Sequence, residues 1–107
     1  MKRGDVITLA LPGSYGKPRP ALMVQSDLFD AHPSVTVLPI TSELRDAPLF
    51  RVRVEPSEEN GLRKVSEIMV DKPHTVARSK VSRAVGRLED DALLTVHRAL
   101  AVFLGFA

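Results

Sequence analysis

The segment Gly16–Gln25 reads GKPRPALMVQ, and it decides how the rest of this 107-residue chain is interpreted. Each of its two prolines fixes its own φ and keeps the residue before it out of the helical region. Lys17 and Arg19 are therefore extended, and the apolar residues that follow predict a strand over Arg19–Gln25. An arginine held between two prolines, where a loop becomes a strand, is a candidate ligand for an anion.

The composition indicates an ordinary globular protein with one domain over residues 1–107. Hydrophobic residues make up 44% of the chain and charged residues 26%, and a core of this size would gain from a second copy. The absence of cysteine excludes disulfides and thiolate chemistry, and it suits the reducing cytoplasm. We expect a cytoplasmic protein without a membrane segment, because no apolar run approaches the ~18–20 residues of a span and the N-terminus lacks a signal-peptide core.

Further strands and one helix are predicted along the chain. β-branched and alternating apolar runs predict strands over Asp5–Leu11, Val35–Ile40, Leu49–Glu55, Val65–Val70, Thr75–Ala77 and Ala84–Leu88. Pro39 cannot donate to a ladder, which predicts an edge position or a bulge. Apolar residues spaced by three and four from Leu93 to Phe103 predict a helix that has Glu89, Asp90 and Asp91 in its first turn and ends at Gly105. The fold class is mainly β (α+β), as a small open barrel or a strongly coiled antiparallel sheet.

Cations and hydroxyls gather at positions where a phosphodiester could bind. Arg51 and Arg53 are two residues apart on a predicted strand, so both leave one face of the sheet. Beside Lys17 and Arg19 they could follow an RNA backbone, and a net charge of +2 is compatible with such a partner. The alternative for Arg51 and Arg53, a solvated outer face, is the favoured one. The hydroxyls of residues 41–42, at a strand end, could equally make a local turn.

The histidines indicate neither a metal site nor an acid–base pair. His32, His74 and His97 are scattered and have no metal-ligand spacing. Acid–base work on RNA needs two such groups together, and nothing in the sequence brings His32 and His97 together. The chain also lacks a phosphate loop, a nucleophile elbow and a dinucleotide fingerprint.

Three segments together resemble the MazF/PemK family of bacterial toxins, within the CcdB/PemK superfamily. They are Arg3–Val6 at the first strand, Lys17–Gln25, and Val37–Ser42, an apolar strand that ends in a threonine. The resemblance implies an SH3-like small β-barrel of about six to seven antiparallel strands with one C-terminal α-helix. It also implies a homodimer.

The same resemblance implies the toxin of a type II toxin–antitoxin system. Such a toxin is a sequence-specific, metal-independent endoribonuclease without a cofactor, which cuts single-stranded mRNA by attack of the RNA's own 2′-hydroxyl. It stops translation and growth, and a cognate antitoxin encoded next to it covers the RNA groove. The family's catalytic positions fall on Arg19 and Thr41. The residues expected to bind RNA are Tyr15, Lys17, Ser42, Arg51 and Arg53, with Tyr15 in a flexible loop over Pro12–Pro18.

The two catalytic residue types fit that chemistry. The planar fork of arginine suits a phosphate whose oxygens gain charge during the attack. A threonine hydroxyl can donate to the same phosphate or orient the 2′-hydroxyl. The general base stays unassigned, because arginine remains protonated in proteins. Tyr15 could stack on a base or simply pack within the loop.

Two other functions remain open from the sequence. One is a non-catalytic poison of DNA gyrase, of the CcdB type, on the same fold. The segments Lys17–Pro20 and Pro39–Ser42 speak against it, and the terminal segment Phe103–Ala107 lacks a tryptophan. The other is a binding module that holds a peptide in the barrel groove without turning over RNA.

Overall fold

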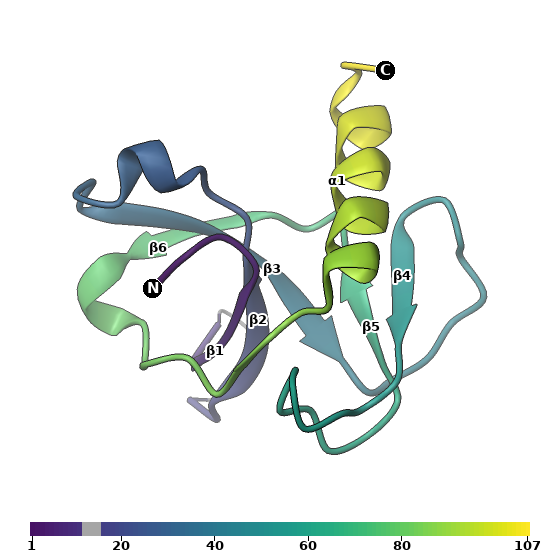
Figure 1. The fold of residues 1–107 in the computed structure, drawn as a ribbon, viewed down its shortest axis with the longest axis horizontal. Coiled ribbons are helices and arrows are strands. Elements are labelled where there is room, and N and C mark those ends of the chain that lie inside the picture. Colours follow the sequence, from purple (N-terminus) through teal and green to yellow (C-terminus); the bar gives the residue numbers. More distant parts are fainter. Residues whose placement is uncertain (12–15) are drawn as a thin grey trace.

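One antiparallel sheet and one C-terminal helix make up the fold in a computed structural model that describes residues 1–11 and 16–107 (Figure 1). The strands are β1 (Asp5–Leu9), β2 (Arg19–Met23), β3 (Ser34–Thr41), β4 (Arg51–Val54), β5 (Ser66–Met69), β6 (His74–Ala77) and β7 (Gly86–Arg87). The helical elements are η1 (Asp27–Phe29) and η2 (Arg78–Lys80), both 3-10, and α1 (Asp90–Leu104). The predicted mainly β class with one C-terminal helix is confirmed.

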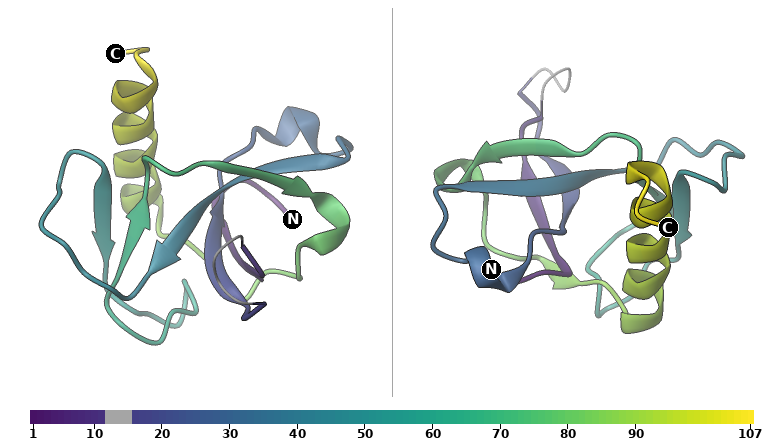
Figure 2. Two further views of the ribbon diagram at one scale, coloured as in Figure 1. Left: turned by 180° about the vertical axis from the view of Figure 1, so that it is seen from behind. Right: turned by 90° about the horizontal axis from the view of Figure 1, so that it is seen from above.

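The sheet runs in the order β4-β5-β3-β2-β1-β7, and β6 adds to β3 beside this path. It curls into a half-barrel, with β4 and β5 on one side of β3 and β1 and β2 on the other (Figures 1 and 2). The central strand β3 therefore has the largest number of partners. Residues at its carboxyl end lie where the two halves of the sheet meet.

Pro39 lies in this central strand, so the prediction of an edge position or a bulge was wrong. The register between β2 and β3 is constant, with Ala21 opposite Pro39 and Met23 opposite Val37. On its other side β3 changes partner, because pairing with β6 ends at Val37 and pairing with β5 begins at Ile40. Pro39 falls between these two partners, where the ladder needs no N–H from it.

The strands bury side chains on both faces, which explains the change of parity along β3. Leu38 and Ile40 join one apolar cluster, which α1 covers with Leu93 and Val96. Val35 and Val37 join a second cluster with residues of β1 and β2, and Val76 and Val81 pack against it. A strand buried on both faces reads as a nearly continuous apolar run rather than a clean alternation.

Helix α1 confirms the predicted end and begins one residue later than predicted. Glu89 is its N-cap residue rather than part of its first turn, and Gly105 ends it in the left-handed conformation at φ 84°. Its first half buries Leu93 and Val96, whereas its second half extends past the sheet (Figure 1) and exposes Phe103 by 49%. The other exposed apolar residues of α1 and of the segment after it are Leu94, Val102, Leu104 and Phe106. No helix in the described ranges is both long enough and apolar enough to cross a bilayer.

Asn60 fastens the β4–β5 connection to the start of α1. Its side chain is fully buried, and its Oδ1 accepts the backbone N–H groups of Ser57 and Leu62 at 3.0 and 2.9 Å. Its Nδ2 donates to the Glu55 carbonyl at 2.9 Å and to Glu89 Oε1 at 3.1 Å. Every polar atom of this amide is therefore satisfied inside the protein, as burial requires.

Candidate active site

Arg19 begins β2 and points its charge into solvent. It lies opposite Leu9 of β1 and is exposed, and its side chain makes no hydrogen bond or ion pair with another described residue. Pro20 follows it directly and fixes the backbone at this point. A guanidinium that is placed by a strand and has no protein partner keeps all its donors for a ligand.

The register of the sheet brings Arg19 to Thr41. The pairing of β2 with β3 is recorded as far as Ala21 opposite Pro39, and Pro20 has no N–H to continue the ladder. Extending this register by two residues places Arg19 opposite Thr41, the last residue of β3. Cross-strand partners share a face. The two predicted catalytic residues are thus neighbours on adjacent strands.

A row of polar side chains continues from Thr41 in the other direction. Thr41 pairs with Glu67 of β5, and Glu67 pairs in turn with Arg53 of β4. Arg51 is two residues from Arg53 and lies on the same face. The row therefore runs from Arg19 through Thr41 and Glu67 to Arg53, across the junction between the two halves of the sheet.

The hydroxyl of Thr41 has one of its interactions fixed by the protein. The backbone N–H of Glu43 donates to Thr41 Oγ1 at 3.0 Å. The oxygen thus acts as an acceptor within the chain, and its own hydrogen remains available to an outside group. Ser42, predicted to bind RNA, follows Thr41 in this turn and is exposed.

Glu67 is the center of a buried ionic cluster, which we call the Arg51–Glu67–Arg53 cluster. Its side chain is 3% exposed, against 7% for Arg51 and 53% for Arg53. Glu67 Oε1 accepts from Arg51 Nη1 at 3.1 Å and from the backbone N–H of Arg45 at 2.9 Å. Glu67 Oε2 accepts from Arg53 Nη2 at 2.8 Å and Nε at 3.2 Å.

These donors keep Glu67 ionised. Burial raises the pKa of Glu67, but the hydrogen bonds from the Arg45 backbone, Arg53 and Arg51 outweigh burial and lower the pKa to about 2. Both carboxylate oxygens are occupied. Glu67 therefore cannot take up a proton near neutral pH.

The cluster corrects the interpretation of Arg51. The sequence favoured a solvated outer face for Arg51 and Arg53, with RNA contact as the alternative. Arg51 is instead buried in an ion pair with Glu67, and it also donates to the Glu43 carbonyl at 2.9 Å. Arg51 is thus unavailable to solvent or RNA, whereas Arg53 remains half exposed.

Sequence reasoning did not single out Glu67. The signal that could have found it is a lone acidic residue in an otherwise apolar short strand, next to a strand with two arginines on one face. Opposite charges on facing positions of neighbouring strands favour each other. The register that makes them face each other comes only from the tertiary structure.

The remaining predicted RNA-binding residues lie before Arg19. Lys17 is exposed at the end of the loop that leads into β2. Tyr15 lies outside the described residues, as does most of the predicted Pro12–Pro18 loop. Arg19 and Lys17 together place two cations at the Arg19 end of the row.

The histidines serve local structure. His97 on α1 accepts from Arg3 Nε at 2.9 Å, and burial together with the nearby positive charge of Arg3 lowers the pKa of His97. His32 bonds within its own turn. Among residues 1–11 and 16–107, no three histidine, aspartate or glutamate side chains gather where they could hold a metal ion.

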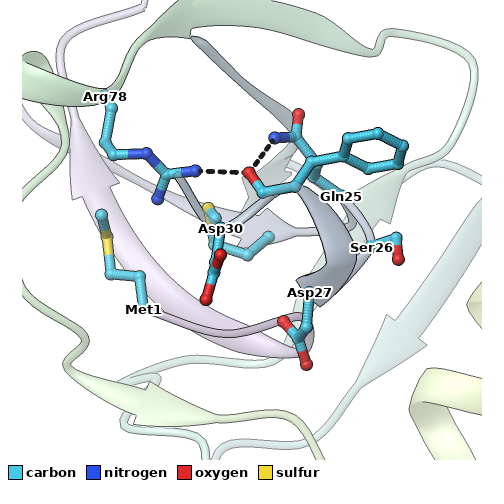
Figure 3. A pocket seen from close by; sticks show the side chains of 8 residues that line it. Met1, Gln25, Ser26, Asp27, Asp30 and Arg78 are labelled. Atoms are coloured by element: carbon cyan, nitrogen blue, oxygen red, sulfur yellow. Dashed lines mark hydrogen bonds between the residues drawn. The ribbon is translucent and has the colours of Figure 1, made fainter. Parts of the chain in front are cut away.

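A small pocket lies at the far end of β2 from Arg19 (Figure 3). Its lining includes Met23 and Gln25, and both Gln25 Nε2 and Arg78 Nη2 donate to the Phe29 carbonyl, at 3.3 and 3.2 Å. These contacts fasten η1 to Gln25, which follows β2, and to Arg78 of η2. The pocket is therefore not part of the row of polar residues at Thr41.

The Arg51–Glu67–Arg53 cluster predicts how stability depends on acid. A carboxyl whose pKa is about 2 in the folded protein and 4.5 ordinarily contributes stability above pH 4.5, and that contribution is lost as pH falls toward 2. We expect Glu67→Gln to lose less stability than the unsubstituted protein between pH 4.5 and pH 2. Urea unfolding midpoints across this range measure the effect. Equal losses in both proteins would contradict it, and the exposed Glu55→Gln serves as control.

Comparison with known proteins identifies relatives of this chain. Residues 2–104 match the family described as PemK-like, MazF-like toxin of type II toxin-antitoxin system. The chain is 52% identical over 108 residues to a Mycolicibacterium smegmatis protein named "Probable endoribonuclease MazF", covering 100% of this chain and 99% of that protein.

Solved structures share the fold. A mycobacterial endoribonuclease in complex with its cognate antitoxin superposes with a TM-score of 0.83 at 22% identity, covering 100% of this chain and 97% of that one. A MazF toxin of Mycobacterium tuberculosis gives 0.79 at 24% identity, covering 94% and 96%. A MazE–MazF structure from Deinococcus radiodurans gives 0.78 at 24%, covering 98% and 96%. With the family match over nearly the whole length, the chain belongs to the PemK/MazF family of type II toxins.

Proposed function

We propose that this protein is the endoribonuclease toxin of a type II toxin–antitoxin system, folded as one domain over residues 1–107. The observation that carries the proposal is the exposed Arg19 side chain, which has no partner among the described residues and which the β2–β3 register, extended by two residues, places opposite Thr41. The name of the 52% identical relative supports the same activity. The RNA is cut at particular short sequences in single-stranded messenger RNA.

The two side chains suit a reaction in which RNA supplies its own nucleophile. The 2′-oxygen attacks the neighbouring phosphorus, the bond to the 5′-oxygen breaks, and the products carry a 2′,3′-cyclic phosphate and a 5′-hydroxyl. Arg19 binds the phosphoryl oxygens while their charge grows. The Thr41 hydroxyl donates a hydrogen bond to the same phosphate or to the 2′-oxygen. DNA lacks the 2′-hydroxyl and therefore supplies no nucleophile.

The proton transfers involve groups other than Glu67. A carboxylate with a pKa of about 2, whose oxygens are both occupied, is a poor base at neutral pH. We assign Arg19 as the ligand of the phosphate and as the proton donor to the departing 5′-oxygen. The base that takes the proton of the 2′-hydroxyl is not assigned to a residue of this chain.

We infer the protein partners of this chain from the same family. Structures of relatives include a mycobacterial toxin with its cognate antitoxin and MazE–MazF complexes. We assign this chain a cognate antitoxin encoded next to it, a homodimeric state and a place in the cytoplasm. The apolar side chains exposed at the end of α1, among them Val102 and Phe103, support burial against another polypeptide.

The test is cleavage of a long RNA by the purified protein in the presence of a chelator. We expect fragments with 5′-hydroxyl ends, cut at a recurring short sequence. A matched oligonucleotide with 2′-deoxyribose at the cleaved position should stay intact, because it lacks the attacking oxygen. Intact RNA across diverse sequences, or equal cutting of the 2′-deoxy substrate, would contradict the proposal.

A further inference from the structure

Arg53 is a cation whose guanidinium is held in place by the protein while the side chain stays half exposed. Its Nε and Nη2 both donate to Glu67 Oε2, at 3.2 and 2.8 Å. Its Nη1 makes no hydrogen bond to any described residue, and 53% of the side chain is exposed. The guanidinium is thus fixed at one edge, while its free edge offers two N–H donors to solvent.

Glu67 also fixes the turn that follows Thr41. It accepts the Arg45 backbone N–H at 2.9 Å, and its partner Arg51 donates to the Glu43 carbonyl at 2.9 Å. The N–H of that same Glu43 residue holds Thr41 Oγ1. The carboxylate of Glu67 therefore connects the orientation of the Thr41 hydroxyl to the orientation of Arg53.

The row offers hydrogen-bond donors at two separate positions, Thr41 and Arg53. Thr41 and Arg53 flank Glu67 on the two neighbouring strands. Strands lie about 4.8 Å apart, so the two residues are separated by roughly 10 Å. An RNA strand that presents its scissile phosphate to Arg19 and Thr41 would bring a neighbouring phosphate to the free edge of Arg53. A negative charge at Glu67 would repel RNA if it were open, but it is 3% exposed and neutralised by two arginines.

We propose that Glu67 is a positioning residue of the RNA site: it holds Arg53 as the ligand of a phosphate next to the scissile one, and it sets the Thr41 hydroxyl through the Glu43–Arg45 turn. This inference rests on the proposed ribonuclease function. It differs from a purely structural role for the ion pair, because it assigns Arg53 a direct contact with RNA.

Binding to an uncleavable RNA tests the role of Arg53. The probe is a single-stranded oligonucleotide spanning a mapped cleavage site, with 2′-deoxyribose at the cleaved position. We expect Arg53→Gln to weaken binding about tenfold and to reduce the slope of log affinity against log salt by ~0.7, the value for one phosphate of a single strand. Arg98→Gln is the control, because it removes one exposed charge from α1, which packs on the opposite face. It should change neither quantity appreciably.

A double substitution separates positioning from charge. Glu67→Gln removes a negative charge, so charge alone would tighten RNA binding. We expect instead that kcat falls about tenfold and that the effect of Arg53→Gln shrinks to below about threefold in the Glu67→Gln background. A folded Glu67→Gln protein with unchanged kcat and an undiminished Arg53→Gln effect would overturn the inference.

Arg53→Lys covers the case in which Glu67→Gln does not fold. It keeps the charge at a half-exposed position but lacks the fork that Glu67 holds. The inference expects Arg53→Lys to bind RNA almost as weakly as Arg53→Gln, and full binding by Arg53→Lys would overturn it. If the unsubstituted protein cuts no RNA, the proposed function fails. The Arg53 variants are then compared on a mixed-sequence single-stranded RNA, where equal affinity for all of them would overturn the inference by itself.

Discussion

Arg19→Ala is expected to lower the rate of RNA cleavage by roughly 10²–10³-fold, the loss seen when a fixed donor to developing charge is removed. The physical reason is that the Arg19 side chain has no partner among the described residues, so in the proposed reaction all its donors can bind the phosphate. The measurement is the single-turnover rate on an oligonucleotide that spans a mapped cleavage site. The fold should be unaffected, because the Arg19 side chain is exposed and makes no hydrogen bond to another described residue.

Controls for Arg19→Ala separate charge from position. Arg98→Ala removes the same charge from an exposed site on α1 and should leave the rate unchanged. Arg19→Lys keeps the charge but not the fork, and should recover only part of the rate. A rate of Arg19→Ala close to that of the unsubstituted protein would refute the catalytic role. Inhibition of DNA gyrase that survives Arg19→Ala would favour the CcdB-type alternative.

Asn60→Ala is expected to reduce the free energy of unfolding by about 3 kcal/mol, because several buried groups lose their partners at once. The backbone N–H groups of Ser57 and Leu62 would lack the Oδ1 acceptor. Glu89 would lose one of its two side-chain donors, the other being Ser57 Oγ at 2.6 Å. Since Glu89 is the residue directly before α1, the loss should also loosen the start of that helix. Urea unfolding at neutral pH measures the change.

Glu58→Ala is the matched control for Asn60→Ala. Glu58 lies in the same connection, is exposed and has no side-chain partner among the described contacts. Its substitution should change the free energy of unfolding by less than about 0.5 kcal/mol. If Asn60→Ala is as stable as Glu58→Ala, the buried amide does not hold the connection to α1.

Local sequence signals were sufficient for the elements that depend on local chemistry. The two prolines around Arg19 predicted where β2 begins, and Gly105 predicted where α1 ends. Pro39 misled the prediction, because a proline is compatible with a central strand where two partner strands leave a gap. Likewise the pattern around Arg51 showed which face it shares with Arg53, but not that this face is buried at Arg51.

The sequence by itself determined the strands, the helix, the family resemblance and the two residue types, arginine and threonine, that its chemistry requires. The tertiary structure alone decided which side chains meet. Arg19 and Thr41 become neighbours through the β2–β3 register, and Glu67 joins Thr41 to Arg53 through the registers of β5. The reason is physical: periodicity fixes the face to which a side chain points, whereas register depends on which strands pair and where.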